Sequence, residues 1–316
     1  MSVLAVAGLG ATSLPALYAP SDQAARRAFE FFTVNIRNTH TRKAYARAAS
    51  DFAAWCALRG VVDLRQVQSV HVAAYIEGLQ VAAPSVKQRL AALRMLFDWL
   101  VIGQVLPLNP AASVRGPRHS VKKGKTPVLL ADEARALIEA IDTSTPIGLR
   151  DRALTALMVY TFARVGAVVK MRLEDVYEQG RRSWVRLHEK GGKQHEMPCH
   201  HKLEEFLHAY IEGAGIVGDK GWLFRSALGR SGELTERPMS QSDVYRMIRR
   251  RAERAGIKTR IGCHSFRATG ITEYLRNGGR LEIAQQMAGH ESARTTGLYD
   301  RRGDQVSLDE VERILI

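Results

Sequence analysis

The sequence has little cysteine and no paired cysteine motif. Its 316 residues include three cysteines, Cys56, Cys199 and Cys263, which lie far apart and form no C-x-x-C. Because a disulfide scaffold needs an even, closely spaced set, we expect a reduced, cytoplasmic chain.

No apolar run approaches the roughly 18 residues of a membrane span. The apolar segment 1–20 has no Lys or Arg, with which a secretory signal would begin, and we expect a flexible or partner-contacting tail.

Acidic residues are scarce relative to basic ones. The chain has 46 Lys and Arg against 32 Asp and Glu, a net charge of +14, and a pI of about 10.0. This balance argues against an acidic or neutral small-molecule enzyme and favours a polyanionic partner, DNA or RNA, with simple solubility as the alternative. The length suggests two domains.

The stretch from Gly262 to Arg302 carries side chains suited to phosphate chemistry. His264 and Arg267 lie one helical turn apart, so both can point at one spot, and His290 and Tyr299 follow nine residues apart. Arginine binds phosphate oxygens with a planar fork that keeps its charge. Tyrosine, with an ordinary pKa of about 10, becomes a nucleophile only with help from its neighbours.

These motifs resemble the tyrosine recombinase family, also called the phage integrase family. The hallmark is H-x-x-R, then G-H, then a tyrosine nine residues later, and all three are present. Upstream, segment 160–165 (YTFARV) resembles the first arginine box, and segment 189–193 (EKGGK) resembles the lysine hairpin. The resemblance spans about residues 20–302. It implies a mainly α fold with a small β-sheet or hairpin in the catalytic domain. It also implies a two-domain clamp, in which an N-terminal helical core-binding domain precedes an α+β catalytic domain.

The resemblance implies a site-specific recombinase or integrase that cuts and rejoins DNA through a 3′-phosphotyrosyl intermediate, without metal, cofactor or ATP. Its partners would be double-stranded DNA with paired recognition sites and other protomers of itself, as a tetramer on DNA. Whether such an enzyme integrates or excises a mobile element, or resolves dimers, stays open. Two alternatives also stay open: a catalytically impaired DNA-binding or architectural relative, and a type IB topoisomerase-like relaxase.

The resemblance assigns the chemistry to Arg164, Lys190, His264, Arg267, His290 and Tyr299. Tyr299 would attack the phosphate, with His264 as its general base. Lys190 would protonate the leaving oxygen, and Lys193 is the rival for that role. The two arginines would hold the non-bridging oxygens and His290 would hydrogen-bond the phosphate.

The first arginine box departs from the family pattern at two points. The family usually has an acidic residue three positions after the arginine, and here that position is Ala167. The box usually reads Gly-Leu-Arg, and here it is Phe162-Ala163-Arg164. Loss of a supporting carboxylate weakens the positioning of a site without removing a reactive group. We therefore expect a substitute contact or a slower, more regulated enzyme.

The N-terminal half predicts a helical DNA-binding domain over residues 21–112. Apolar spacing predicts helices from Ser21, from Thr39 to Gly60, over 70–79, and from Ala83 to about residue 100. Basic faces on these helices suggest DNA contacts, although a solvated surface is the plainer interpretation. Residues 113–126 form a basic linker that is expected to lie along DNA or to act as a hinge. The candidate contacts are Arg42, Lys43, Arg47, Lys87, Arg89, Arg94, Arg115, Arg118, Lys122 and Lys123.

Residues 127–302 predict the catalytic domain. Helices are expected over 131–141, from Pro146 with Arg164 at the end, and over 202–213, with a hairpin of strands 184–188 and 194–197. Ser240 is expected to cap a further helix whose basic row would lie on DNA. The candidate contacts here are Lys193, Arg246, Arg250 and Arg254.

Two remaining features carry weaker predictions. His195, Cys199, His200 and His201 suggest zinc, but adjacent histidines do not easily share a tetrahedral site, so no metal is expected. Residues 303–316 predict a tail helix capped by Ser307. Its apolar stripe, Leu308, Val311, Ile314 and Leu315, would pack on a neighbouring protomer or on its own domain.

Overall fold

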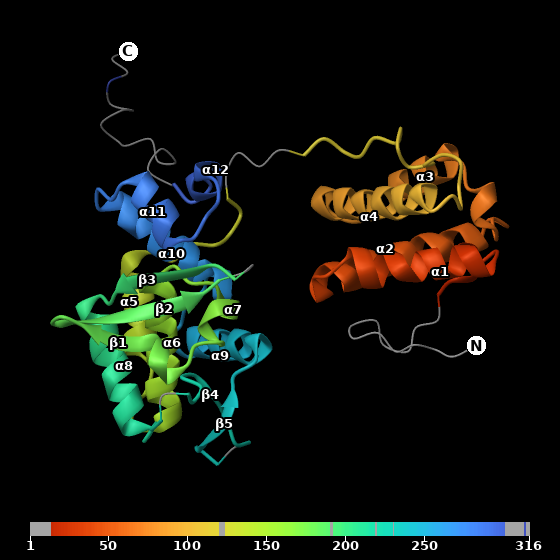
Figure 1. Ribbon diagram of the computed structural model, residues 1–316. Coiled ribbons are helices and arrows are strands. Elements are labelled where there is room, and N and C mark those ends of the chain that lie inside the picture. The colour runs from red at the N-terminus through yellow and green to blue at the C-terminus, as the bar shows by residue number, and fades with distance from the viewer. Residues whose placement is uncertain are drawn as a thin grey trace. The chain divides into compact units, whose positions relative to one another are not determined.

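The computed structural model describes residues 14–119, 124–189, 192–218, 220–229, 231–300 and 313. The chain divides into two compact units, Met1–Ser120 and Val121–Ile316, and each is described by itself (Figure 1). Within the described residues, no helix is long and apolar enough to cross a membrane. The predicted tail helix over 303–316 lies almost wholly outside the described residues.

The first unit consists of helices in its described part. Its elements are η1 (Ala16–Tyr18), α1 (Asp22–Glu30), the π-helical turn η2 (Phe31–Asn35), α2 (Thr39–Ala57), η3 (Leu64–Gln66), α3 (Ser69–Glu77) and α4 (Ala83–Ile102). The hydroxyl of Ser21 accepts the Ala24 N–H and caps α1, and the Asn38 side chain caps α2. The four predicted helices are confirmed. The prediction that Gly60 ends the second helix is confirmed: α2 ends at Ala57, Gly60 adopts φ of 73°, and the Val61 N–H donates to the Cys56 carbonyl at 3.0 Å.

An aromatic cluster fills the core of the first unit. The rings of Phe52 and Tyr75 meet edge to face with centroids 5.1 Å apart, and Phe97 meets Phe52 at 6.1 Å. These rings come from α2, α3 and α4, so burying them packs the three helices together.

The second unit contains the remaining elements. Its helices are α5 (Ala131–Glu139), α6 (Pro146–Tyr160), α7 (Val165–Val168), η4 (Leu173–Asp175), α8 (His201–Gly213), α9 (Gln241–Arg254), α10 (Cys263–Arg276), α11 (Leu281–Met287) and α12 (Ala293–Gly297). Helix α6 is buried along most of its length and packs against α8 and α10. The expectation that Arg164 ends this helix is wrong, because α6 ends at Tyr160 and Arg164 occupies the N-cap position of the next helix, α7.

The strands of the second unit form two small antiparallel sheets. One has the order β1 (Val176–Gln179), β2 (Arg182–His188), β3 (Gln194–Pro198), and the other pairs β4 (Arg225–Ala227) with β5 (Leu234–Pro238). The predicted hairpin is β2–β3, in which Leu187 pairs with His195 and His188 with Gln194. Strands β1, β4 and β5 were not predicted. They are short and contain no fully buried residue, so their sequences lack a clear alternation of apolar residues.

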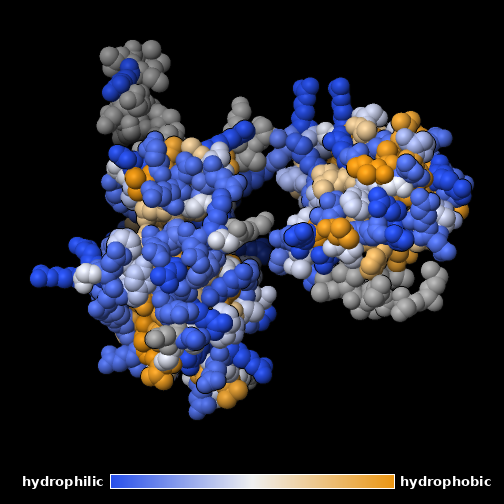
Figure 2. Space-filling view, viewed as in Figure 1, coloured by the Kyte–Doolittle hydropathy of each residue, from blue (hydrophilic) through white to orange (hydrophobic). Residues whose placement is uncertain are grey.

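A glycine lets α10 approach α6 closely. A Cβ at Gly270 would lie 2.2 Å from the Val159 carbonyl oxygen and 2.7 Å from the Phe162 ring, so no larger residue fits without movement. This approach places the start of α10 beside the loop that follows α6. In the space-filling view the surface is mostly hydrophilic, with scattered apolar patches (Figure 2).

Candidate active site

Tyr299 and His264 meet in the second unit. His264 lies in the first turn of α10, and Tyr299 follows α12. The Nε2 of His264 lies 2.6 Å from the Tyr299 Oη, and Tyr299 is 7% exposed. If His264 acts as the base, the phenol donates this bond and Nε2 accepts it. A tyrosine and a histidine in this contact are a nucleophile and a proton acceptor within reach of each other.

His290 completes a stack of rings around the tyrosine. Its imidazole lies parallel to the Tyr299 ring at 6°, with centroids 5.8 Å apart. Its Nδ1 lies 2.9 Å from the Thr296 hydroxyl oxygen, a contact that holds the ring's orientation. The residue is 8% exposed. The side chain is therefore fixed against one face of the phenol.

Arg267 is the most deeply buried charged group of the site, at 1% exposure. Its Nη1 donates to the Phe162 carbonyl and its Nη2 to the Ala288 carbonyl. Its Nε is buried and has no hydrogen-bond partner among the described residues. A buried donor without a partner is costly, and a phosphate oxygen would satisfy it.

Arg164 lies on the loop between α6 and α7, where it is 39% exposed at its side chain. Its Nη1 lies 2.7 Å from Oε2 of Glu189, which follows β2 and is 5% exposed at its side chain. The sequence did not single out Glu189. The contact joins residues 25 positions apart, so no local pattern reveals it.

The electrostatics of the site favour a neutral histidine beside a protonated phenol. Burial, and then the positive charges of Arg267 and Arg164, lower the pKa of His264 below its ordinary 6.5. Burial raises the pKa of Tyr299 above 10.0, against the opposing effect of the two arginines. Burial first and then both arginines lower the pKa of His290 to about 3. Burial lowers the pKa of Arg267 to about 10, so it stays charged at neutral pH.

Phe162 adopts the left-handed backbone conformation, with φ of 55°. For residues other than glycine, this conformation costs about 1–2 kcal/mol of free energy. The arginine box usually has glycine at this position, and glycine adopts the left-handed conformation readily. This chain keeps that backbone conformation although the residue is phenylalanine. The Phe162 ring is buried and meets Tyr274 edge to face at 6.1 Å, and this burial offsets the backbone cost.

His195 also belongs to this region, and the sequence placed it only in a doubtful zinc cluster. Burial lowers the pKa of His195, and Glu189 opposes this effect. Arg267 and Arg164 lower the pKa further, so the same two arginines act on His195 and on His264. Its Nε2 is buried without a partner among the described residues. Pairing with buried Leu187 turns it to the inner face of the hairpin. Period-two alternation in the strand was the signal that could have found it.

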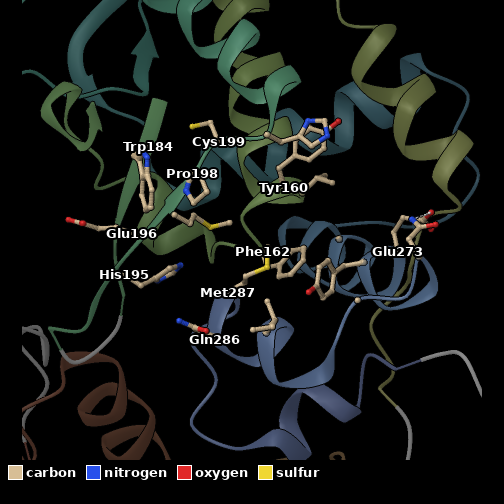
Figure 3. Close-up of a pocket in the computed structure, with 18 of the residues that line it drawn as sticks. Tyr160, Phe162, Trp184, His195, Glu196, Pro198, Cys199, Glu273, Gln286 and Met287 are labelled. Carbon is tan, nitrogen blue, oxygen red and sulfur yellow. Dashed lines mark hydrogen bonds between the residues drawn. The ribbon is translucent and has the colours of Figure 1, made fainter. Parts of the chain in front are cut away.

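A cavity of about 910 Å³ borders His195. Figure 3 shows His195 pointing from β3 toward Met287 and Gln286 of α11. Tyr160 and Trp184 also line the cavity. His200, another member of the suspected zinc cluster, caps α8 by accepting the Lys202 N–H and stacks on Tyr160. No group of three or more potential metal-ligating side chains is found among the residues described.

The lysine hairpin is only partly described. Lys190, the predicted general acid, lies outside the described residues. Lys193 is exposed, and its Nζ lies 2.7 Å from Oε1 of Glu291, which follows His290. The side chains in this pair are 60% and 82% exposed, so the contact contributes little stability.

Three of the predicted DNA contacts in the first unit make contacts within that unit. Arg42 is buried, and its Nε and Nη2 donate to the Ile36 carbonyl at 3.1 and 2.8 Å. Arg89 pairs with Asp51, and Arg94 donates to the carbonyls of Ala111 and Val114. These guanidiniums help to hold the unit together, and their contact with DNA stays a prediction.

The remaining candidates divide between exposed and undescribed residues. Those with exposed side chains are Lys43, Arg47, Lys87, Arg115, Arg118, Lys193, Arg246, Arg250 and Arg254. Lys122 and Lys123 lie outside the described residues. On α9, Arg246 pairs with Asp243 across one turn. Arg251 of the same helix points inward and meets the buried Asp151 at 2.8 Å, so only the outer side of α9 remains basic.

Comparison with known proteins identifies the two parts of the chain. The family model described as "Phage integrase family" matches residues 127–305, and the model of the phage integrase N-terminal SAM-like domain matches residues 34–103. The chain is similar to tyrosine recombinase XerD of Corynebacterium glutamicum, at 27% identity over 83% of this chain and 87% of the relative. It is also similar to tyrosine recombinase XerC of Xanthomonas campestris pv. campestris, at 28% identity over 93% and 90%.

Solved structures agree on the fold. A lambda integrase tetramer bound to a Holliday junction matches with a TM-score of 0.69 at 19% identity, covering 90% of this chain and 79% of that one. XerH recombinase in a post-cleavage complex with a palindromic difH substrate matches with a TM-score of 0.68 at 16% identity, covering 95% and 89%. The predicted mainly helical fold, with an N-terminal helical domain and small sheets in the second domain, is confirmed.

Proposed function

The chain belongs to the phage integrase family of tyrosine recombinases, and we propose that it is a site-specific recombinase that cuts and rejoins DNA through a phosphotyrosyl intermediate. One observation carries the proposal at the level of chemistry. The phenol of Tyr299 lies 2.6 Å from an imidazole whose pKa is lowered by burial and by two arginines. A neutral base, a protonated nucleophile and fixed positive charge are what attack on a phosphodiester requires.

The proposed reaction balances without an outside reagent. Tyr299 Oη attacks phosphorus while His264 takes the phenol proton, and the bond from phosphorus to the 5′ oxygen breaks. Lys190 gives that oxygen a proton, which leaves a 3′-phosphotyrosyl bond and a free 5′-hydroxyl. Arg164 and Arg267 neutralise the non-bridging oxygens, so the step uses neither ATP nor a metal ion. The 5′-hydroxyl of a second strand can then reverse the attack.

The partners we propose are paired sites on double-stranded DNA and further copies of the chain. One protomer cuts one strand, so exchanging both strands of two duplexes takes four tyrosines. Residues 21–112 would form a DNA-binding domain, residues 113–126 a basic linker and residues 127–302 the catalytic domain. We place the activity in the cytoplasm, where DNA and reduced cysteines are found together.

The proposal is tested with DNA selected by the protein itself. Duplexes bound from a randomised pool are re-synthesised with a nick beside the cleavage position, so that the released fragment diffuses away and the adduct accumulates. We expect an SDS-stable protein–DNA adduct from the wild type and none from Tyr299→Phe, which removes only the attacking oxygen. A plasmid with two selected sites should recombine.

Other outcomes would favour the alternative functions. Specific binding without any adduct would refute the enzyme and indicate an architectural relative. An adduct with relaxation of supercoiled plasmid, but no exchange between two sites, would indicate a topoisomerase-like relaxase. An adduct formed by Tyr299→Phe would show that another residue is the nucleophile.

A further inference from the structure

Arg164 depends on a single side-chain contact among the described residues. Its Nη1 is 2.7 Å from Oε2 of Glu189. Arg267, by contrast, is held by two backbone carbonyls. Arg164, the more exposed of the two arginines, is therefore held by one carboxylate, and Arg267 is held by the backbone.

The residue one turn after Arg164 cannot supply this contact. Ala167 donates its N–H to the Arg164 carbonyl at 2.8 Å, which places it in the first turn of α7. Its methyl group is buried and carries no charge. The carboxylate that supports Arg164 therefore comes from a different element, the end of β2.

Glu189 is well placed to hold the guanidinium. Its N–H donates to the Lys193 carbonyl at 2.7 Å, directly after the last pair of the hairpin, His188 with Gln194. Its side chain is 5% exposed, so water competes little for the carboxylate. The guanidinium has five N–H donors, and one contact with Oε2 sets its orientation while leaving others for a phosphate.

The carboxylate cannot itself bind the reacting phosphate, because two negative groups repel each other at contact distance. Its effect on the reaction must pass through Arg164. We propose that Glu189 is a positioning residue that presents Arg164 to the scissile phosphate, in place of the carboxylate that Ala167 lacks. This inference rests on the proposed function.

The first experiment replaces the carboxylate by an amide of the same shape. With saturating nicked duplex, Glu189→Gln should slow single-turnover adduct formation by about 10–100-fold, the usual effect of losing a partner that orients a reactive group. The dissociation constant for the duplex should change by no more than about twofold, since Glu189 does not contact DNA in this scheme.

A matched control lies on the same hairpin. Glu196 of β3 meets Arg186 of β2 with an identical 2.7 Å contact, and it is more exposed. Glu196→Gln makes the same chemical change and the same change of net charge. Its rate of adduct formation should equal that of the wild type, which would show that a lost charge alone does not slow the reaction.

A double-mutant cycle tests whether Glu189 acts through Arg164. Arg164→Lys keeps a charge but removes the fork, so the further loss caused by Glu189→Gln in that background should fall to about twofold or less. Equal losses in both backgrounds would overturn the proposal.

Two further outcomes would also overturn it. A wild-type rate in Glu189→Gln would show that the carboxylate does not matter, and a faster rate would show that it restrains Arg164 instead of presenting it. A wild-type protein that forms no adduct refutes the proposed function and the role of Glu189 with it. Adduct formation by the wild type with an unchanged Glu189→Gln rate refutes the role of Glu189 alone.

Discussion

Replacing His264 by glutamine would test general base catalysis in a quantitative way. Glutamine can still accept a hydrogen bond from Tyr299, but it cannot take the proton. Burial raises the pKa of Tyr299 above 10.0, so at most roughly one molecule in 10³ carries a phenolate at pH 7. Without a base, cleavage must proceed through that fraction. We therefore expect a loss of at least about 10³-fold at pH 7, within the range of general acid–base effects.

The pH dependence of this loss distinguishes the mechanism from simple misfolding. The pKa of His264 is lowered below 6.5, so the base is neutral, and the wild-type rate flat, from pH 7 to 9. The wild-type rate should fall only below that range, as His264 gains a proton. The phenolate fraction rises about tenfold per pH unit, so the deficit of His264→Gln should shrink by about 10²-fold between pH 7 and 9.

The measurement is single-turnover adduct formation on the nicked duplex, quenched in SDS and resolved on a denaturing gel. Tyr299→Phe serves as the blank at each pH. If the ratio of wild-type to His264→Gln rates stays constant from pH 7 to 9, the histidine is not the proton acceptor, and its contact with Tyr299 only orients the ring.

Three further predictions concern the leaving group, the DNA surface and the backbone. Lys190→Ala should lose much more activity on an ordinary duplex than on one with a 5′-thio leaving group, because a thiolate departs without a proton; Lys193→Ala should lose equally on both, and the reverse pattern would transfer the role to Lys193. DNA binding should weaken steeply with salt, by about −0.9 in the slope of log K against log salt for each phosphate neutralised, and a slope near zero in a fluorescence titration would refute a basic DNA surface. Phe162→Gly should be more stable than Phe162→Ala by about 1–2 kcal/mol, because only glycine relieves the φ of 55°; chemical denaturation checks the order, and equal stabilities would show that the backbone relaxes in both variants.

The residues that the sequence located well are those whose geometry is local. His264 and Arg267 are three positions apart in one helix, so their common direction follows from helical periodicity. The hairpin was visible because β2 alternates and Gly191-Gly192 favours a turn. In both cases the residues are close in the sequence, so the sequence pattern predicts their arrangement without knowledge of the fold.

The residues that it missed depend on contacts between distant elements. Glu189 contacts Arg164, 25 positions away, and His195 lies beside Met287 of α11, and neither neighbour follows from spacing in the sequence. Charge patterns had a related weakness. Arg42 and Lys43 are neighbours on α2, yet one is buried against the Ile36 carbonyl and the other is exposed. Successive helical residues differ by about 100° in direction, so a basic cluster does not tell which members face solvent.

Helix α10 explains how these distant pieces come together. His264, at its start, contacts the phenol of Tyr299, and the Thr272 hydroxyl, two turns later, donates to the Tyr299 carbonyl at 2.9 Å. Between them Arg267 donates to Phe162 and to Ala288, so the loops that carry Arg164 and His290 are both attached to one buried side chain.

This arrangement suits phosphoryl transfer, in which the protein contributes mainly positioning and fixed charge. A change at Arg267 would therefore displace Arg164 and His290 as well as remove a phosphate ligand. Glu189 completes the same scheme from the opposite side, because Arg164 lies on a loop that α10 holds only through the backbone. The helix sets where the loop lies, and the carboxylate sets where its guanidinium points.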